Sequence, residues 1–148
     1  MSYNIAVVGL GKIATDQHLP CIAKNPSFNL VAGVSRNATI ASVPCFKSIE
    51  ALAASGVAVD AVSLCTPPSV RLVMAQQALA AGYHLLIEKP PTPTMGESHA
   101  IIEAAARAGK VGLLLLGPTG TGKTHLARAF HYESTRGGGP FVVLDCGQ

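Results

Sequence analysis

Two glycines and an alanine near the start of the chain have the spacing of a dinucleotide-binding turn. Gly9, Gly11 and Ala14 follow an apolar run at residues 4–8, and residues 12–25 have helical character. The first glycine permits a tight turn, the second lets a pyrophosphate approach the backbone, and the helix N-terminus offers free N–H groups to the phosphates. The predicted cofactor-binding residues of this turn are Gly9, Leu10, Gly11, Lys12, Ile13 and Ala14. The alternative is a glycine turn that binds no ligand.

The end of the second predicted strand, at residues 29–34, bears on the choice of cofactor. Sites for NAD usually carry Asp or Glu there, which binds the ribose hydroxyls, whereas this chain has Ser35 and Arg36. An arginine can bind a 2′-phosphate through charge-assisted hydrogen bonds, and a carboxylate would repel it. We therefore expect NADP in preference to NAD, with Ser35 and Arg36 as cofactor residues. The alternative is that Arg36 is a solvated surface residue.

A second phosphate-binding pattern begins at residue 117. Residues 117–124 fit G-x-x-x-x-G-K-[ST] in full, after an apolar run at residues 111–116 and before an expected helix. The backbone N–H groups of such a loop surround a phosphate, its lysine reaches the β and γ oxygens, and its hydroxyl binds Mg²⁺. The predicted ATP phosphate-binding residues are Gly117, Gly120, Thr121, Gly122, Lys123 and Thr124, with Thr124 as a Mg²⁺ ligand if ATP binds. A chance match in a glycine-rich turn is the alternative.

The remaining elements alternate between strand and helix. The other predicted strands are residues 29–34, 43–46, 60–65, 83–87, 111–116 and 141–144, and the other predicted helices are residues 48–54, 69–81, 95–108 and 123–133. Pro20 should kink the first helix or stop it early, and Pro44 should place its strand near an edge. Alternation implies right-handed βαβ units. The fold class is therefore α/β, a Rossmann-like doubly wound parallel sheet in three α/β/α layers, with ligands beyond the carboxyl ends of the strands.

Two longer motifs end the strands at residues 60–65 and 83–87. They read DAVSLCTPP at residues 60–68 and AAGYHLLIEKP at residues 80–90. With residues 8–14, they resemble the N-terminal half of the glucose–fructose oxidoreductase/inositol dehydrogenase/MocA family, whose hallmark is Glu-Lys-Pro. Within that family they most resemble bacterial galactose or arabinose 1-dehydrogenases.

The resemblance implies roles for several residues. Thr66 and Pro67 would border the nicotinamide ribose, Glu88 would line the cofactor site, and Lys89 would contact substrate and cofactor at the hydride-transfer centre. A lysine there can polarise or help to deprotonate a sugar hydroxyl. Arg71 stands where many members have a histidine. Family members also carry a second domain that supplies the sugar-binding wall, and nothing after residue 110 resembles it.

The segment at residues 111–148 resembles a different family. The sequence LLLLGPTGTGKTHLARA and the later GPFVVLDC are similar to the opening of an AAA+ domain, with bacterial enhancer-binding transcription activators as the closest class. In that family the strand at residues 141–144 precedes the Walker B strand. The magnesium carboxylate, sensors, arginine finger and lid are absent, so we expect phosphate binding without turnover.

Composition limits the classes of function. The chain has 148 residues, 49% apolar and 13% charged, with a net charge of +3, which suits one folded domain. No face is obviously basic, so we expect no clear nucleic-acid or membrane surface. The apolar run at residues 111–116 is too short to span a bilayer, and the cytoplasm is the expected compartment. The four cysteines lack C-x-x-C spacing and the five histidines lack ligand spacing, so we expect structural roles for them.

Two units follow from these motifs. Residues 1–110 are predicted to form a dinucleotide-binding domain, and residues 111–148 a truncated P-loop segment that shares its sheet. The first hypothesis is an NADP-binding domain of a sugar dehydrogenase-type oxidoreductase without its substrate domain. The alternatives are an ATP-binding fragment of an AAA+ transcription regulator, or a folded chimera without activity. The expected partner is a nucleotide, and the oligomeric state is left open.

Overall fold

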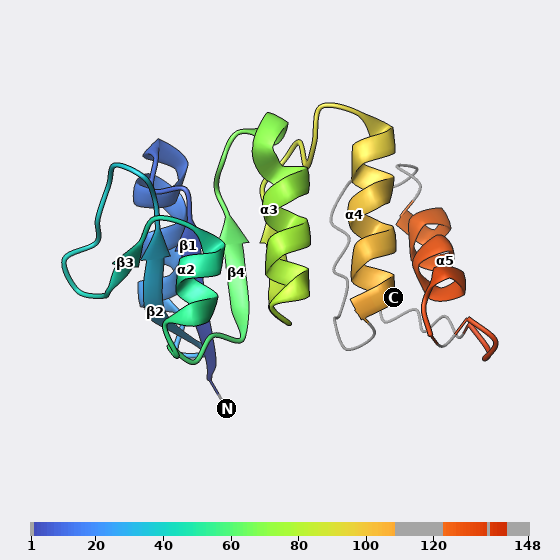
Figure 1. Ribbon diagram of the computed structural model, residues 1–148, viewed down its shortest axis with the longest axis horizontal. Helices are drawn as coiled ribbons and strands as arrows, with labels where there is room; N and C mark the ends of the chain where they lie inside the picture. Colours follow the sequence, from blue (N-terminus) through green and yellow to red (C-terminus); the bar gives the residue numbers. More distant parts are fainter. Residues whose placement is uncertain (1, 109–122, 136, 142–148) are drawn as a thin grey trace.

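A computed structural model describes residues 2–108, 123–135 and 137–141. Its sheet has five parallel strands in the order β3-β2-β1-β4-β5 (Figure 1). The strands are β1 (Tyr3–Val8), β2 (Phe28–Val34), β3 (Cys45–Phe46), β4 (Ala61–Leu64) and β5 (His84–Ile87). The predicted strand at residues 111–116, the loop at 117–122 and residues 142–144 of the last predicted strand lie outside the described residues.

Helices cover both faces of the sheet, which confirms the predicted α/β fold. They are η1 (Ala14–His18), α1 (Leu19–Lys24), α2 (Ile49–Ala54), α3 (Pro68–Ala80), α4 (Met95–Ala108) and α5 (Lys123–Glu133). Alternate strand residues point to opposite faces. One face, with Ile5 and Val7, packs against the first helix through Ala14 and Ile22. The other face packs against α2, α3 and α4, and α5 lies against α4 (Figure 1).

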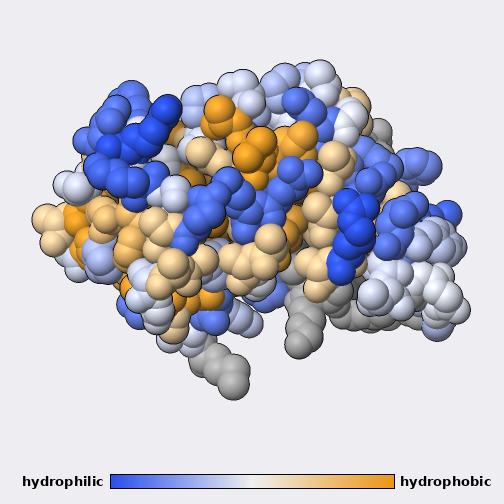
Figure 2. All heavy atoms as spheres, in the orientation of Figure 1, coloured by the Kyte–Doolittle hydropathy of each residue, from blue (hydrophilic) through white to orange (hydrophobic). Residues whose placement is uncertain are grey.

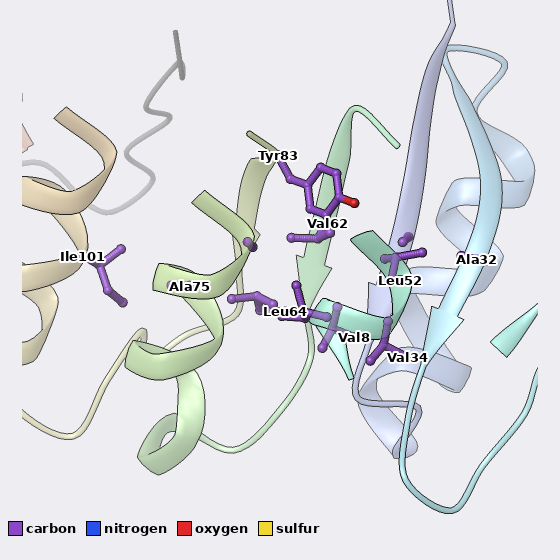
Figure 3. Close-up of a cluster of buried hydrophobic side chains, with 12 residues drawn as sticks. Val8, Ala32, Val34, Leu52, Val62, Leu64, Ala75, Tyr83 and Ile101 are labelled. Atoms are coloured by element: carbon purple, nitrogen blue, oxygen red, sulfur yellow. The ribbon is translucent and has the colours of Figure 1, made fainter. Parts of the chain in front are cut away.

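The larger core lies beneath α2, α3 and α4. Its labelled members in Figure 3 are Val8, Ala32, Val34, Leu52, Val62, Leu64, Ala75, Tyr83 and Ile101. Buried β-branched residues fill the central strands because both of their faces are covered. Apolar side chains also gather on the surface over α3 (Figure 2), where Val70 and Val73 are exposed.

Local signals set several element ends where the sequence predicts them. Ser48 precedes α2, and its side chain accepts a hydrogen bond from the backbone N–H of Ala51 at 3.2 Å, as an N-cap residue does. Gly82 follows α3 with a φ of +82°, a conformation that glycine adopts without strain. The short strand β3 lies at the edge of the sheet, as Pro44 predicts. Capping residues therefore determine the start of α2 and the end of α3, and Pro44 accounts for the edge position of β3.

Pro20 does not stop the first helix, so the predicted early stop is wrong. Residues 12–24 are helical throughout, and Pro20 lies in the first turn of α1. The five residues of η1 form a π-helical turn, in which the backbone N–H of Leu19 donates to the carbonyl oxygen of Ala14. This wider turn changes the hydrogen-bond register just before the proline, whose missing N–H then falls at the start of a new helical segment.

No helix among the described residues is long and apolar enough to cross a membrane.

Candidate functional site

The carboxyl ends of the five parallel strands meet at one edge of the sheet, and the predicted cofactor residues follow those ends. Backbone hydrogen bonds continue the pairing past the strands: Gly9 N donates to Val34 O at 2.8 Å, and Ser35 N donates to Phe46 O at 2.9 Å. On the other side, Glu88 N donates to Leu64 O at 3.4 Å. The structure therefore brings the ends of β1, β2, β4 and β5 to one site.

The two glycines of the first turn differ in what surrounds them. Gly9 has a φ of +87°, and a Cβ built there would lie 2.6 Å from Thr66 Cγ2 and 3.0 Å from Thr66 N. Gly11 is exposed, and a Cβ built there would have no heavy atom within 4 Å. The fold therefore requires glycine at position 9, whereas the bare backbone at position 11 leaves open space in which a phosphate can approach.

The other residues of this turn divide between packing and exposure. Leu10 and Ala14 are buried and join the core beneath the first helix. Lys12 is exposed, and its ammonium donates to Asp16 in an i,i+4 pair. Ile13 is half-buried against the same core. The small side chain of Ala14, fully buried, lets the helix start close to β1.

The loop after β2 carries Ser35 and Arg36 at the edge next to β1. The Ser35 hydroxyl accepts hydrogen bonds from the backbone N–H groups of Asn37 and Ala38 at 3.4 and 3.2 Å, so its own proton is left to donate. The Arg36 side chain is exposed and has no partner among the described residues. This loop can therefore offer a hydroxyl and a guanidinium to an anion.

Thr66 and Pro67 follow β4 directly opposite the glycine turn. Thr66 is buried, and its Oγ1 is the one buried side-chain oxygen or nitrogen in the described part of the chain without a hydrogen-bond partner. A buried hydroxyl without a partner costs free energy that a ligand can recover. Pro67 is exposed and stands just before α3. Thr66 therefore places an unpaired hydroxyl next to Gly9, the first glycine of the turn.

The side chain of Glu88 is held by His18, for which the sequence predicts a structural role. His18 Nε2 lies 2.9 Å from Glu88 Oε1, and His18 Nδ1 lies 2.9 Å from Ser63 Oγ. A carboxylate accepts from Nε2–H, so this tautomer leaves Nδ1 to accept from the serine hydroxyl. The chain of three side chains ties η1 to the ends of β4 and β5. No local spacing could reveal it, because His18 and Glu88 are 70 residues apart.

Arg71 is a second residue whose part in the site the sequence did not predict. It is 4% exposed, and its Nε donates to the carbonyl oxygen of Thr66 at 2.7 Å. Its Nη1 donates to the carbonyl oxygens of Glu88 and Pro90. Burial lowers the pKa of Arg71 from its ordinary value, and the nearby Glu88 carboxylate opposes that shift. Arg71 therefore links the backbone of the loop after β4, at Thr66, to that of the loop after β5, at Glu88 and Pro90.

Lys89 lies between these anchored neighbours. Its side chain is exposed and has no hydrogen-bond partner among the residues that the structure describes. At the end of β4, burial raises the pKa of the Cys65 thiol, which keeps it protonated and unreactive. Lys89 is thus the free cationic group at the carboxyl end of β5, presented by a backbone that Arg71 holds on both sides.

The structure describes only two of the predicted P-loop residues, Lys123 and Thr124. Residues Gly117, Gly120, Thr121 and Gly122 lie outside the described residues. The helix α5 begins at Lys123, as predicted, and Thr124 is exposed in its first turn. Across the described ranges, no three His, Cys, Asp or Glu side chains gather in a way that could hold a metal ion.

Comparison with known proteins decides the family. Residues 3–115 match the model of the GFO/IDH/MocA oxidoreductase family, described as an NAD-binding Rossmann fold. The chain belongs to this family. A GFO/IDH/MocA relative, galactose 1-dehydrogenase from Pseudomonas fluorescens, is 47% identical over 95 residues, which cover 64% of this chain and 31% of that protein. The crystal structure of D-galactose-1-dehydrogenase from Rhizobium etli superposes with a TM-score of 0.70 at 46% identity, over 73% of this chain and 35% of that one.

The family assignment confirms the predicted resemblance and the nucleotide-binding Rossmann fold. The chain spans about a third of the length of these two relatives, 31% and 35%.

The C-terminal part matches a second family. Residues 91–148 match the model of the sigma-54 interaction domain. The hydrogenase transcriptional regulatory protein HoxA from Bradyrhizobium diazoefficiens is 46% identical over 56 residues, or 36% of this chain and 12% of that protein. This confirms the predicted similarity to AAA+ activators. The two family models overlap at residues 91–115, which include α4 and residues 111–115 of the apolar run.

Proposed function

We propose that the chain binds NADP at the carboxyl edge of the sheet, as the cofactor-binding part of a sugar dehydrogenase. The observation that carries the proposal is the exposed turn at Gly11, where an added Cβ would meet no heavy atom of the described residues within 4 Å. The unpaired hydroxyl of Thr66, a residue packed against Gly9 of the same turn, supports it. The pyrophosphate would bind to the backbone of residues 9–14, and the 2′-phosphate to Ser35 and Arg36. A bound nicotinamide supplies hydride transfer.

Lys89 is the proposed catalytic residue within this site. Its exposed side chain has no partner among the described residues, so the ammonium is free to donate a hydrogen bond to a sugar oxygen and polarise it, and only the neutral amine form could accept the proton of a sugar hydroxyl. Arg71 fixes the carbonyl oxygens of the residues on either side of Lys89, and His18 fixes the side chain of Glu88. These contacts position the backbone of Lys89, and its ammonium takes part in none of them. We propose sugar oxidation because the relatives are galactose 1-dehydrogenases. That reaction requires a whole enzyme, which includes a substrate domain.

Reversal of charge at Arg36 tests the choice of cofactor. In Arg36→Glu we expect NADPH affinity to fall by about 30-fold or more, because a charge-assisted hydrogen bond is lost and a repulsion is added. NADH affinity should hold or rise, since a carboxylate can accept from ribose hydroxyls. Titration followed by NAD(P)H fluorescence gives both values. Lys24→Glu makes the same charge change at the end of α1, beside the amino end of β2, and should leave the preference intact.

A second function is proposed because the sigma-54 interaction domain matches residues 91–148. We infer that residues 111–116 form a further strand of the same sheet and that residues 117–124 bind the phosphates of ATP. The packing of α5 against α4 supports a shared unit of residues 1–110 and 111–148.

Lys123→Ala tests the ATP site separately. We expect the variant to lose ATP binding by about tenfold or more, since the lysine reaches the β and γ phosphates, and to retain NADPH binding. Isothermal titration with Mg-ATP and with NADPH measures the two sites on one sample. Equal ATP affinity in the variant and the parent chain would refute the P-loop assignment.

A further inference from the structure

Two cationic residues, Arg36 and Lys47, follow the carboxyl ends of the adjacent strands β2 and β3. Val34 and Phe46 are paired at the ends of β2 and β3, so the loop with Arg36 and the residue Lys47 start side by side. Lys47 Nζ donates to the carbonyl oxygen of Arg36 at 2.8 Å. The ammonium therefore lies at the backbone of the residue whose guanidinium is proposed to bind the 2′-phosphate. Figure 2 shows hydrophilic residues gathered at the upper left, around the carboxyl ends of these strands and the start of the first helix.

Neither cation is neutralised by an acidic residue in the part of the chain that the structure describes. Arg36 and Lys47 are both exposed, and neither forms an ion pair within the described ranges. The next carboxylate along the chain, Glu50, accepts a hydrogen bond from the amide of Gln77 on α3. Two neighbouring cations without an acid between them repel each other, and an anion that contacts both removes that repulsion.

We propose that Lys47 is a second phosphate-binding cation, which acts with Arg36 on the 2′-phosphate of NADP and so determines cofactor preference. This inference rests on the proposed function. An ammonium has three N–H donors, and the contact with Arg36 uses one. The 2′-phosphate is a monoester with a charge of about −1.5 to −2, and its three free oxygens match donors from several groups.

The three donors have separate places around this phosphate. The guanidinium of Arg36 binds it as a flat fork, the Ser35 hydroxyl donates its free proton, and Lys47 adds a compact charge from the β3 side. The pyrophosphate of the cofactor binds at the glycine turn after β1, on the opposite side of the β2 loop. Lys47 therefore acts on the one group that distinguishes NADP from NAD.

Lys47→Gln isolates the charge, because glutamine can still donate a hydrogen bond. We expect its NADPH affinity to fall about fivefold, the size expected for one exposed charge pair, with NADH affinity unchanged. The effect should shrink as salt is raised from low ionic strength. Lys47→Arg keeps the charge and should restore most of the NADPH affinity. Lys24→Gln, which removes a charge beside the amino end of β2, is the matched control and should bind as the parent chain does.

The outcomes separate this inference from the proposed function. An equal loss of NADPH and NADH affinity in Lys47→Gln would mean that the lysine only tethers the loop, and it would overturn the inference. Unchanged NADPH affinity would overturn it as well, while a loss in Arg36→Glu would keep the NADP assignment. If Arg36→Glu also binds NADPH as the parent chain does, both proposals fail.

Discussion

Gly9→Ala is expected to destabilise the fold, whereas Gly11→Ala is expected to weaken cofactor binding and leave the fold stable. At Gly9 the backbone has a φ of +87°, and the added methyl would lie 2.6 Å from a Thr66 carbon atom. The strained conformation and the overlap together should lower the free energy of unfolding by about 3 kcal/mol. Thr66 N and the backbone of Cys65 also border the site, so no single side-chain movement relieves the overlap.

At Gly11 the same methyl meets no protein atom within 4 Å. The free energy of unfolding should therefore change by less than about 1 kcal/mol. NADPH affinity should fall by about tenfold or more, since the methyl occupies space that a pyrophosphate would enter. Urea denaturation and NADPH titration of both variants measure the two effects. A Gly11→Ala protein that binds NADPH as tightly as the parent chain would contradict the placement of the pyrophosphate.

Arg71→Met is expected to lower the free energy of unfolding by about 3 kcal/mol. The methionine fills most of the buried volume but leaves the carbonyl oxygens of Thr66, Glu88 and Pro90 without their donor, and buried groups without partners are costly. Arg71→Lys should be intermediate, because one ammonium cannot reproduce the planar fork of the guanidinium. Thermal and urea denaturation provide the comparison.

Arg107→Met is the matched control for Arg71→Met. Arg107 lies on α4 with 65% of its side chain exposed and forms an i,i+4 pair with Glu103 at 3.5 Å. Its loss should cost less than about 0.5 kcal/mol. If Arg71→Met is as stable as Arg107→Met, the buried guanidinium does not hold the two motif loops together, and the support proposed for Lys89 is lost.

The sequence predicts the strands and most helix ends because short-range signals determine them. The apolar runs of β1, β2 and β4 are buried on both faces, and Ser48 and Gly82 mark helix ends through their own backbone and side-chain chemistry. Proline rules predict the edge position of β3 correctly, whereas the early stop that they allow at Pro20, as the alternative to a kink, does not occur. The π-helical turn that accommodates Pro20 depends on residues before it and has no simple sequence signal.

The residues that support the site could not be predicted in this way, because their partners are distant in sequence. His18 reaches Glu88 and Ser63, and Arg71 reaches carbonyl oxygens on two loops. A lone histidine or an arginine on an otherwise apolar helix carries no signal of such contacts. Only the parallel sheet, which brings the strand ends to one edge, makes them neighbours. Motifs therefore predict the residues that would touch the cofactor, and the tertiary structure adds those that position them.

Titration of the purified chain with NADPH, NADH and Mg-ATP tests the central claim most directly. The proposed site predicts saturable NADPH binding that is about tenfold tighter than NADH binding, a difference of about 1.4 kcal/mol. NADPH should bind independently of Mg-ATP, since the two phosphate sites use different strands. A chain that shows no saturable NADPH binding up to millimolar concentration, while it remains folded, would contradict the assignment of a cofactor site to this edge.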